Sequence, residues 1–486
     1  MYGGGNAGNT GGSATVTVRM GDIDGNVFGG ARMANVAGST FVNIDGEHAP
    51  DNTFILINRV YGGNDIAGTI GTSASIPTEL TAVGTEAGKN DIDNTWNTFV
   101  RVSSAPDNSN QRGYIGQLFG GGNGEYYYNN NSGTHAIYES EKDFTESKDP
   151  IATTTEDFIQ PSIDRTYLEI VGGSIVYAYG GGNKATINQK TVIYVDNDSH
   201  VVNSIEEVSG TEDVQLLTME RIKRMGINTT FSHPTSGEYQ IGSFFGGNNK
   251  ADMAIRPTWN LKKGKIRNIY SGGNEGRMTS PDGLLLEIRA DSELEADYIY
   301  GGCRKADVRP LDAGGNDVAT VNNLPGYFFP AGYAARTLVR GGKHINNVYG
   351  GNDISGRVYF GSALGIYTTI YGDVYGGGNG SYPYTDNEKL KGDLIYGDFY
   401  YGDFKTENGY TSSVAALNDF RPNAEQVSLR LAGTEPKKTI IHGGVYVGGN
   451  SATLKPTSDN STSELKIGSY VIADKVFLGN NGENMV

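Results

Sequence analysis

The sequence predicts an all-β chain, a right-handed parallel β-helix with three short strands in each coil. Two observations lead to this prediction: the 486 residues include 71 Gly and 30 Tyr, and a short unit ending in an aromatic residue and glycines recurs along the chain. Each Gly inside a helix costs about 1 kcal/mol relative to Ala, so this glycine content argues against a helical bundle. Collagen is excluded because the sequence has only 15 Pro and no regular Gly-X-Y period.

The recurring unit consists of an apolar residue, a Tyr or Phe, two glycines or a close variant, and often an Asn. Successive copies are 25 to 71 residues apart, and the short spacings cluster between 25 and 33 residues. That is the size of one supersecondary unit that stacks on its neighbours. Twelve copies begin at Met1, Val27, Val60, Leu118, Ala178, Phe244, Ile269, Ile299, Val348, Val374, Val445 and Val476.

Each unit offers three short strands that are separated by turns. An apolar alternation over residues 16–23 precedes the apolar pair Val27-Phe28, and a small residue and another apolar residue follow several copies, as in Ala306-Asp307-Val308. Such strands fit one coil of a β-helix, in which each strand pairs in parallel with its equivalent one coil away. Crossovers between parallel strands strongly favour one hand, so we expect a right-handed coil.

We interpret the glycine corners as structural. Glycine is expected to supply left-handed backbone at the turn, while Asn hydrogen-bonds local backbone or the Asn of the next coil. The preceding aromatic residues are expected to form a stacked column along the coils. The corner residues predicted in this way are Gly62, Gly63, Asn64, Gly180, Gly181, Asn183, Gly350, Gly351, Asn352, Gly376, Gly377 and Asn379.

The chain 1–486 is predicted to be a single β-solenoid and a segment of a longer protein. The long spacings place insertions near 71–95, 125–165, 196–240, 306–335 and 381–425, and residues 211–225 have the caps and charges of one short helix. Long loops on a rigid scaffold are common recognition sites, although their aromatic side chains can equally pack on their own scaffold. The candidate binding residues are Tyr126, Tyr127, Tyr128, Tyr327, Phe328, Tyr400 and Tyr401.

The sequence contains few motifs that carry chemistry. Its six His show no metal-ligand spacing, its single Cys (Cys303) cannot form an internal disulfide, and no nucleophile elbow or phosphate loop occurs. We therefore predict no catalytic residue, no metal and no cofactor. Three carboxylate pairs are interpreted as solvated turns, with calcium binding as the alternative. Asp65 and Asp353, which are equivalent in two coils, are expected to hydrogen-bond their corners. The pairs are Asp22 with Asp24, Asp91 with Asp93, and Asp196 with Asp198.

Charge and hydropathy limit the partners. The chain carries 39 basic and 55 acidic side chains, a formal net charge of −16, which disfavours nucleic acid because phosphate binding needs Lys and Arg. No apolar run reaches the length of about 18 residues that spans a bilayer. Both ends fall inside the repeat, so we expect end-to-end self-association with further copies.

The Val374-Tyr375-Gly376-Gly377-Gly378-Asn379 corner and its copies resemble the Gly/Asn-rich β-helix repeats of large bacterial cell-surface and adhesin-like proteins. The resemblance covers nearly the whole chain outside the insertions. It implies an extracellular, non-enzymatic structural or adhesive protein, or a filament, on the bacterial cell surface that binds a glycan or protein through its loops.

Two alternatives to this function stay open. A carbohydrate-active lyase or hydrolase of β-helix fold predicts several Asp or Glu side chains that converge with Arg or Lys in a groove on one face. A phage tail fibre or tailspike predicts a trimer.

Overall fold

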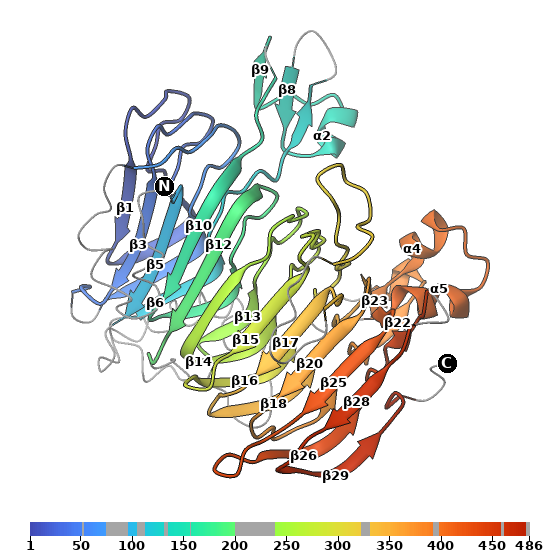
Figure 1. The fold of residues 1–486 in the computed structure, drawn as a ribbon. Coiled ribbons are helices and arrows are strands. Elements are labelled where there is room, and N and C mark those ends of the chain that lie inside the picture. The colour runs from blue at the N-terminus through green and yellow to red at the C-terminus, as the bar shows by residue number, and fades with distance from the viewer. Residues whose placement is uncertain are drawn as a thin grey trace. The chain divides into compact units, whose positions relative to one another are not determined.

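The computed structural model describes residues 1–50, 53–73, 96–104, 112–130, 135–155, 157–199, 239–321, 331–391, 398–457 and 461–482 (Figure 1). The chain divides into two compact units, Met1–Gly242 with Asn248–Ala251 and Ser243–Gly247 with Asp252–Val486. Strands dominate the described residues and nearly all of them pair in parallel, whereas the helices are few and short. The prediction of an all-β chain is therefore confirmed.

The first unit contains two long parallel ladders of strands. Strands that are neighbours in space are equivalent strands of successive repeats, so that Val16 pairs with Val42 and Val42 with Val100. Isolated parallel bridges, such as Val36 to Ile70, form a third and shorter series. One ladder contains β1 (Ala14–Val18), β3 (Thr40–Gly46), β5 (Thr98–Ser104), β10 (Ser162–Ile170) and β12 (Thr186–Asp196), and the other contains β2 (Gly21–Phe28), β4 (Phe54–Tyr61), β6 (Arg112–Phe119) and β11 (Ser174–Tyr179).

The second unit repeats this arrangement with three parallel ladders. The first contains β14 (Thr258–Tyr270), β16 (Glu293–Tyr300), β18 (His344–Tyr349), β21 (Val374–Tyr375), β26 (Thr439–Tyr446) and β29 (Val471–Phe477). The second contains β15 (Leu284–Ile288), β17 (Ala335–Val339), β20 (Ser362–Ile366), β25 (Val427–Leu431) and β28 (Glu464–Ile467). The third contains β19 (Arg357–Val358), β24 (Asn423–Ala424) and β27 (Thr453–Leu454). Bridges from Met253 through Met278 and Val308 to Val358 extend the third ladder. The division of the sequence between Gly242 and Ser243 falls within β13 (Ile241–Phe245).

The core of each unit is a narrow stack of apolar side chains, one from each strand of a ladder. Val27, Val60 and Leu118 follow one another in register and are each 0 % exposed, as are Ile299, Val348 and Val374 in the second unit. Burying each such side chain contributes about 1.5 to 3 kcal/mol, so the repeats stabilise one another by stacking. We call one such repeat a coil.

The predicted aromatic column is present in both units. Successive ring centroids are 4.6 to 5.0 Å apart and the rings lie nearly parallel, which matches the spacing of about 4.8 Å between paired strands. The columns are Tyr2, Phe28, Tyr61, Phe119 and Tyr179 in the first unit, and Phe245, Tyr270, Tyr300, Tyr349, Tyr375, Tyr446 and Phe477 in the second.

Two of the predicted insertions contain strands or helices outside the ladders, one in each unit. Residues 125–165 form an antiparallel sheet of β7 (Tyr127–Asn129), β8 (His135–Tyr138) and β9 (Ala152–Thr154) with the helix α2 (Glu141–Thr145). Residues 381–425 contain β22 (Tyr384–Thr385), the 3₁₀ turn η2 (Glu388–Leu390), β23 (Phe399–Tyr400) and the helices α4 (Gly402–Glu407) and α5 (Ser413–Phe420). The predicted helix at 211–225 lies outside the described residues. No helix in the described parts of the chain is long and apolar enough to cross a membrane.

Candidate functional site

The glycine corners bring the backbones of successive coils into contact. The Gly62 N–H donates to the carbonyl of Phe119 at 3.0 Å, and a Cβ on Gly62 would lie 2.3 Å from the carbonyl oxygen of Gly120. Gly350 repeats this geometry, with its N–H 2.9 Å from the carbonyl of Tyr375. Glycine is required at these corners because the next backbone occupies the space of a side chain.

This geometry corrects the conformational reason that we expected for the corner glycines. None of the eight has a positive φ, so the expectation of left-handed backbone at these positions is wrong. The eight glycines are Gly62, Gly63, Gly180, Gly181, Gly350, Gly351, Gly376 and Gly377.

The corner asparagines bind the neighbouring coil in two ways. The Oδ1 of Asn352 accepts the Cys303 N–H at 2.8 Å while its Nδ2 donates to the carbonyl of Ala306 at 2.9 Å. Asn64 bonds the preceding coil in the same way, through the Ala31 N–H at 2.8 Å. Asn183 and Asn379 instead belong to side-chain ladders, in which each amide donates to the residue one coil before it. These ladders run through Asp65, Asn123, Asn183 and Asn249 in the first unit, and through Asp353, Asn379, Asn450 and Asn481 in the second.

A buried aspartate stands at the head of each amide ladder. Asp353 is 1 % exposed and accepts hydrogen bonds from Tyr270 Oη at 2.8 Å, Asn379 Nδ2 at 2.9 Å and Tyr382 Oη at 2.7 Å. Burial raises the pKa of Asp353, and these hydrogen bonds offset part of the rise. The carboxylate thus holds the first residues of the 381–425 insertion against the coils.

Asp65 does the same for the 125–165 insertion. It accepts from Asn123 Nδ2 at 2.8 Å, Tyr126 Oη at 3.0 Å and Tyr2 Oη at 2.7 Å, while Tyr128 Oη donates to the carbonyl of Ile66. The sequence carries the signal for this duplication, because two motifs each occur twice. Gly-Gly-Asn-Asp-Ile occurs at 62–66 and 350–354, and Gly-Gly-Gly-Asn-Gly-x-Tyr-x-Tyr occurs at 120–128 and 376–384.

The candidate aromatic binding residues have different environments. Tyr126 and Tyr128 direct their hydroxyls into the coil, whereas Tyr127 stacks on Phe144 of its own insertion with ring centroids 5.1 Å apart. Tyr401 is 5 % exposed, and half-buried Tyr400 lies 5.5 Å below the ammonium of Lys391. The structure does not gather these side chains into one site, and Tyr327 and Phe328 lie outside the described residues.

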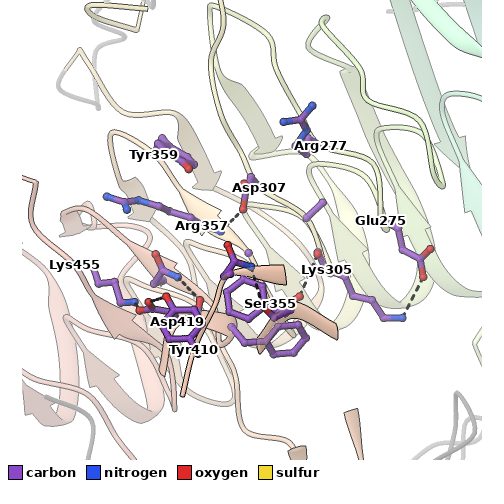
Figure 2. A pocket seen from close by; sticks show the side chains of 16 residues that line it. Glu275, Arg277, Lys305, Asp307, Ser355, Arg357, Tyr359, Tyr410, Asp419 and Lys455 are labelled. Atoms are coloured by element: carbon purple, nitrogen blue, oxygen red, sulfur yellow. Dashed lines mark hydrogen bonds and ion pairs between the residues drawn. The ribbon is translucent and has the colours of Figure 1, made fainter. Parts of the chain in front are cut away.

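A pocket in the second unit combines the coil surface with the 381–425 insertion (Figure 2). Its volume is about 580 Å³, within the range of about 300 to 1,000 Å³ of small-molecule sites. The coil side contributes Glu275, Arg277, Lys305, Ala306, Asp307, Ser355, Gly356, Arg357 and Tyr359. The insertion contributes Phe404, Asn408, Tyr410, Asp419 and Phe420, and the next two repeats of the third ladder contribute Asn423 and Lys455.

The coil side of the pocket is a row of alternating charges. Arg277, Asp307 and Arg357 each precede the bridge residue of successive coils, and Figure 2 shows them following one another across the face. The backbone N–H of Arg357 donates to Asp307 Oδ1 at 2.8 Å, and Arg277 makes the same contact with Asp252 at 2.9 Å. The sequence signal for this row is the charged residue between the small and the apolar residue that follow each of these corners, as in Ala306-Asp307-Val308.

Most charged groups of the pocket are paired. Lys305 Nζ lies 3.2 Å from Glu275 Oε1, and Lys455 and Tyr410 both contact Asp419. Asp307 differs, because among the described residues it forms no ion pair within 4.0 Å and accepts only a backbone N–H. Burial raises the pKa of the half-buried Asp307 carboxyl, against the lowering effects of Arg277, Arg309 and Arg357.

Neither the predicted carboxylate pairs nor the cysteine builds a second site. Within the described ranges no group of three or more His, Cys, Asp and Glu side chains is placed to hold a metal ion. Asp196 accepts a hydrogen bond from Tyr194 at 3.1 Å, while Asp91 and Asp93 are outside the described residues. Cys303 is buried, and burial raises its thiol pKa to about 12, which leaves it a weak nucleophile at neutral pH.

Comparisons with known proteins add no family to this description. A scan against protein-family models, a search of curated proteins and a search of solved structures each found no match.

Proposed function

We propose that the chain is a right-handed parallel β-helix that serves as a non-enzymatic structural and adhesive scaffold on the bacterial cell surface. Three series of parallel pairs in each unit, each in register from one repeat to the next, support the coil. The strong preference of parallel crossovers for one hand supports the right-handed sense. An experimental density map that traces successive coils with a left-handed sense would overturn this part of the proposal.

The observation that most supports adhesion is the pocket beside the 381–425 insertion. It joins a surface made of residues from five successive repeats to an insertion whose first residues are held by Asp353. Binding sites are commonly carried by loops on rigid scaffolds in this way. The buried Asp and Asn side chains of the described ladders, in contrast, are already engaged by other protein groups.

A binding assay on the whole chain tests this function. Immobilised chain is exposed to a panel of bacterial and host-surface saccharides and to intact cells, and retention is measured before and after long incubation. We expect retention without chemical change of the saccharide. Absence of retention on every saccharide and every cell type would overturn the adhesive role.

Asp307 favours one second candidate, a carbohydrate-active enzyme. A carboxyl with a raised pKa, no ion pair among the described residues and three neighbouring arginines has the environment of a general acid. Incubation with acidic polysaccharides followed by measurement of new reducing and unsaturated ends distinguishes the two functions. Turnover that disappears in Asp307→Asn while binding persists would establish the enzyme, and no new ends with either protein would exclude this reaction for the polysaccharides used.

A further inference from the structure

The pocket is richer in cations than the chain as a whole. Four basic and three acidic side chains line it, although the whole chain has 39 basic and 55 acidic residues. Burial lowers the pKa of Lys305, and the nearby cations Arg304 and Lys391 lower it further. Burial also lowers the pKa of Lys455, with an added effect of Arg357. An anionic group that enters this pocket would therefore favour the protonated form of both lysines, in addition to their partners Glu275 and Asp419.

Arg357 is the cation best prepared for an anion. Its Nη2 donates to Glu425 Oε1 at 2.8 Å, while its buried Nε–H has no hydrogen-bond partner among the described residues. Its guanidinium lies 4.8 Å from the ring centroid of Tyr359, and Arg309 lies 5.2 Å from the same ring. Such stacking limits the motion of the guanidinium, and because the Arg357 side chain is 27 % exposed, its accessible N–H groups are held in place for a carboxylate.

The carboxylates of the same pocket define the rest of the ligand. Asp307 and Asp419 accept hydrogen bonds and repel other anions, so a ligand without O–H donors, such as sulfate, would add no hydrogen bond to Asp307, which accepts only a backbone N–H among the described residues. A saccharide supplies hydroxyl donors at close spacing. The rings of Tyr359, Phe404 and Tyr410 add apolar faces to this lining, as in sites that accept the C–H face of a ring.

We propose that this pocket binds an acidic oligosaccharide, which deepens the adhesive function proposed above and rests on it. One sugar carboxylate accepts from Lys305 and another from Arg357, hydroxyl groups donate to Asp307 and Asp419, and a sugar ring lies against Tyr359 or Tyr410. The row of alternating charges explains why one ligand needs both a carboxylate and hydroxyls.

Titration calorimetry on the whole chain tests the proposal with defined probes. The probes are oligomers of galacturonate, of mannuronate and guluronate, of hyaluronan and of sialic acid, together with methyl-esterified galacturonate oligomers and neutral galactose oligomers. We expect at least one acidic oligomer to bind, its affinity to fall with added salt, and its methyl ester or neutral counterpart to bind at least tenfold more weakly.

A matched pair of variants assigns the binding to the pocket. Lys305→Gln removes a lysine whose partner Glu275 is 43 % exposed, so no buried charge is stranded. Lys343→Gln removes an exposed lysine that pairs with Glu295 at 2.8 Å elsewhere in the same unit and serves as the control for charge. We expect Lys305→Gln to weaken binding about tenfold or more and Lys343→Gln to leave it within about twofold.

The possible results separate this inference from the function on which it rests. Equal binding by the two variants, equal binding of acid and methyl ester, or no binding of any acidic oligomer would overturn the pocket assignment. Retention of the chain on cells in those cases would leave the adhesive scaffold in place. Loss of retention on cells as well would overturn both.

Discussion

Substituting Ala for Gly302 tests the idea that the corners are glycine because coils approach closely. A Cβ on Gly302 would lie 2.0 Å from Asn352 Oδ1, so the Asn352 side chain must leave its site. Asn352 is 1 % exposed, and its departure breaks the hydrogen bonds to the Cys303 N–H and the Ala306 carbonyl. Each buried group left unsatisfied costs about 1 to 3 kcal/mol, so we expect Gly302→Ala to lower the free energy of unfolding by about 2 to 6 kcal/mol.

Guanidinium unfolding followed by circular dichroism measures this loss. The control is Gly479→Ala at the equivalent corner of the β29 coil, where an added Cβ meets nothing within 4 Å, and we expect a change of about 0.5 kcal/mol or less. The two compact units can unfold in separate transitions, so the midpoints of the two variants are compared for the transition that shifts in Gly302→Ala. Equal midpoints for the two variants would refute the close-approach explanation.

A double substitution sharpens the test. In an Asn352→Gly background the oxygen that the new Cβ would meet is absent, so Gly302→Ala should cost about 1 kcal/mol or less. A cost as large as in the wild-type background would mean that Gly302 is required for another reason.

Three further predictions concern other contacts. Tyr382→Phe removes the hydroxyl that donates to Asp353, so limited proteolysis should cut the 381–425 insertion faster than in wild type. The control is Tyr371→Phe, because the Tyr371 side chain is 45 % exposed. Equal cutting rates in the two variants would contradict the anchoring role. Burial raises the pKa of Glu169 to about 7 despite Arg101, so the folded state holds its proton while the unfolded state loses it near pH 4.5, and stability should fall by about 3 kcal/mol between pH 4.5 and 7. Glu169→Gln should lack this decline. If wild type and Glu169→Gln differ in unfolding free energy by the same amount at pH 5 and at pH 8, the raised pKa of Glu169 is refuted. Phe119 lies inside an aromatic column and is 0 % exposed, so Phe119→Ala should lower the free energy of unfolding by about 3 to 5 kcal/mol. Phe477 is 44 % exposed at a column end, so Phe477→Ala should lower it by clearly less. Equal losses would rule out a main contribution from the column.

Most of the candidate site was not predictable from the sequence. The duplicated Gly-Gly-Asn-Asp-Ile pattern indicated that Asp65 and Asp353 are equivalent, but not that Tyr126 and Tyr382 dock two insertions on them. The pocket residues extend from Glu275 to Lys455, and the insertion side chains meet the coil surface only after the chain has folded. No local pattern records such contacts, because they depend on where a long loop returns.

The sequence alone determined the β-rich class, the repeat and the aromatic column, because each is the same short-range pattern reproduced in every coil. Val60, Val348 and Val374 are buried in equivalent places for the same reason in both units. Tertiary structure decided why the corners need glycine and which charges share a pocket. Both depend on distances between residues of different coils, such as the 2.3 Å from a Cβ on Gly350 to the Gly376 oxygen, and a linear pattern of residue types contains no such distance.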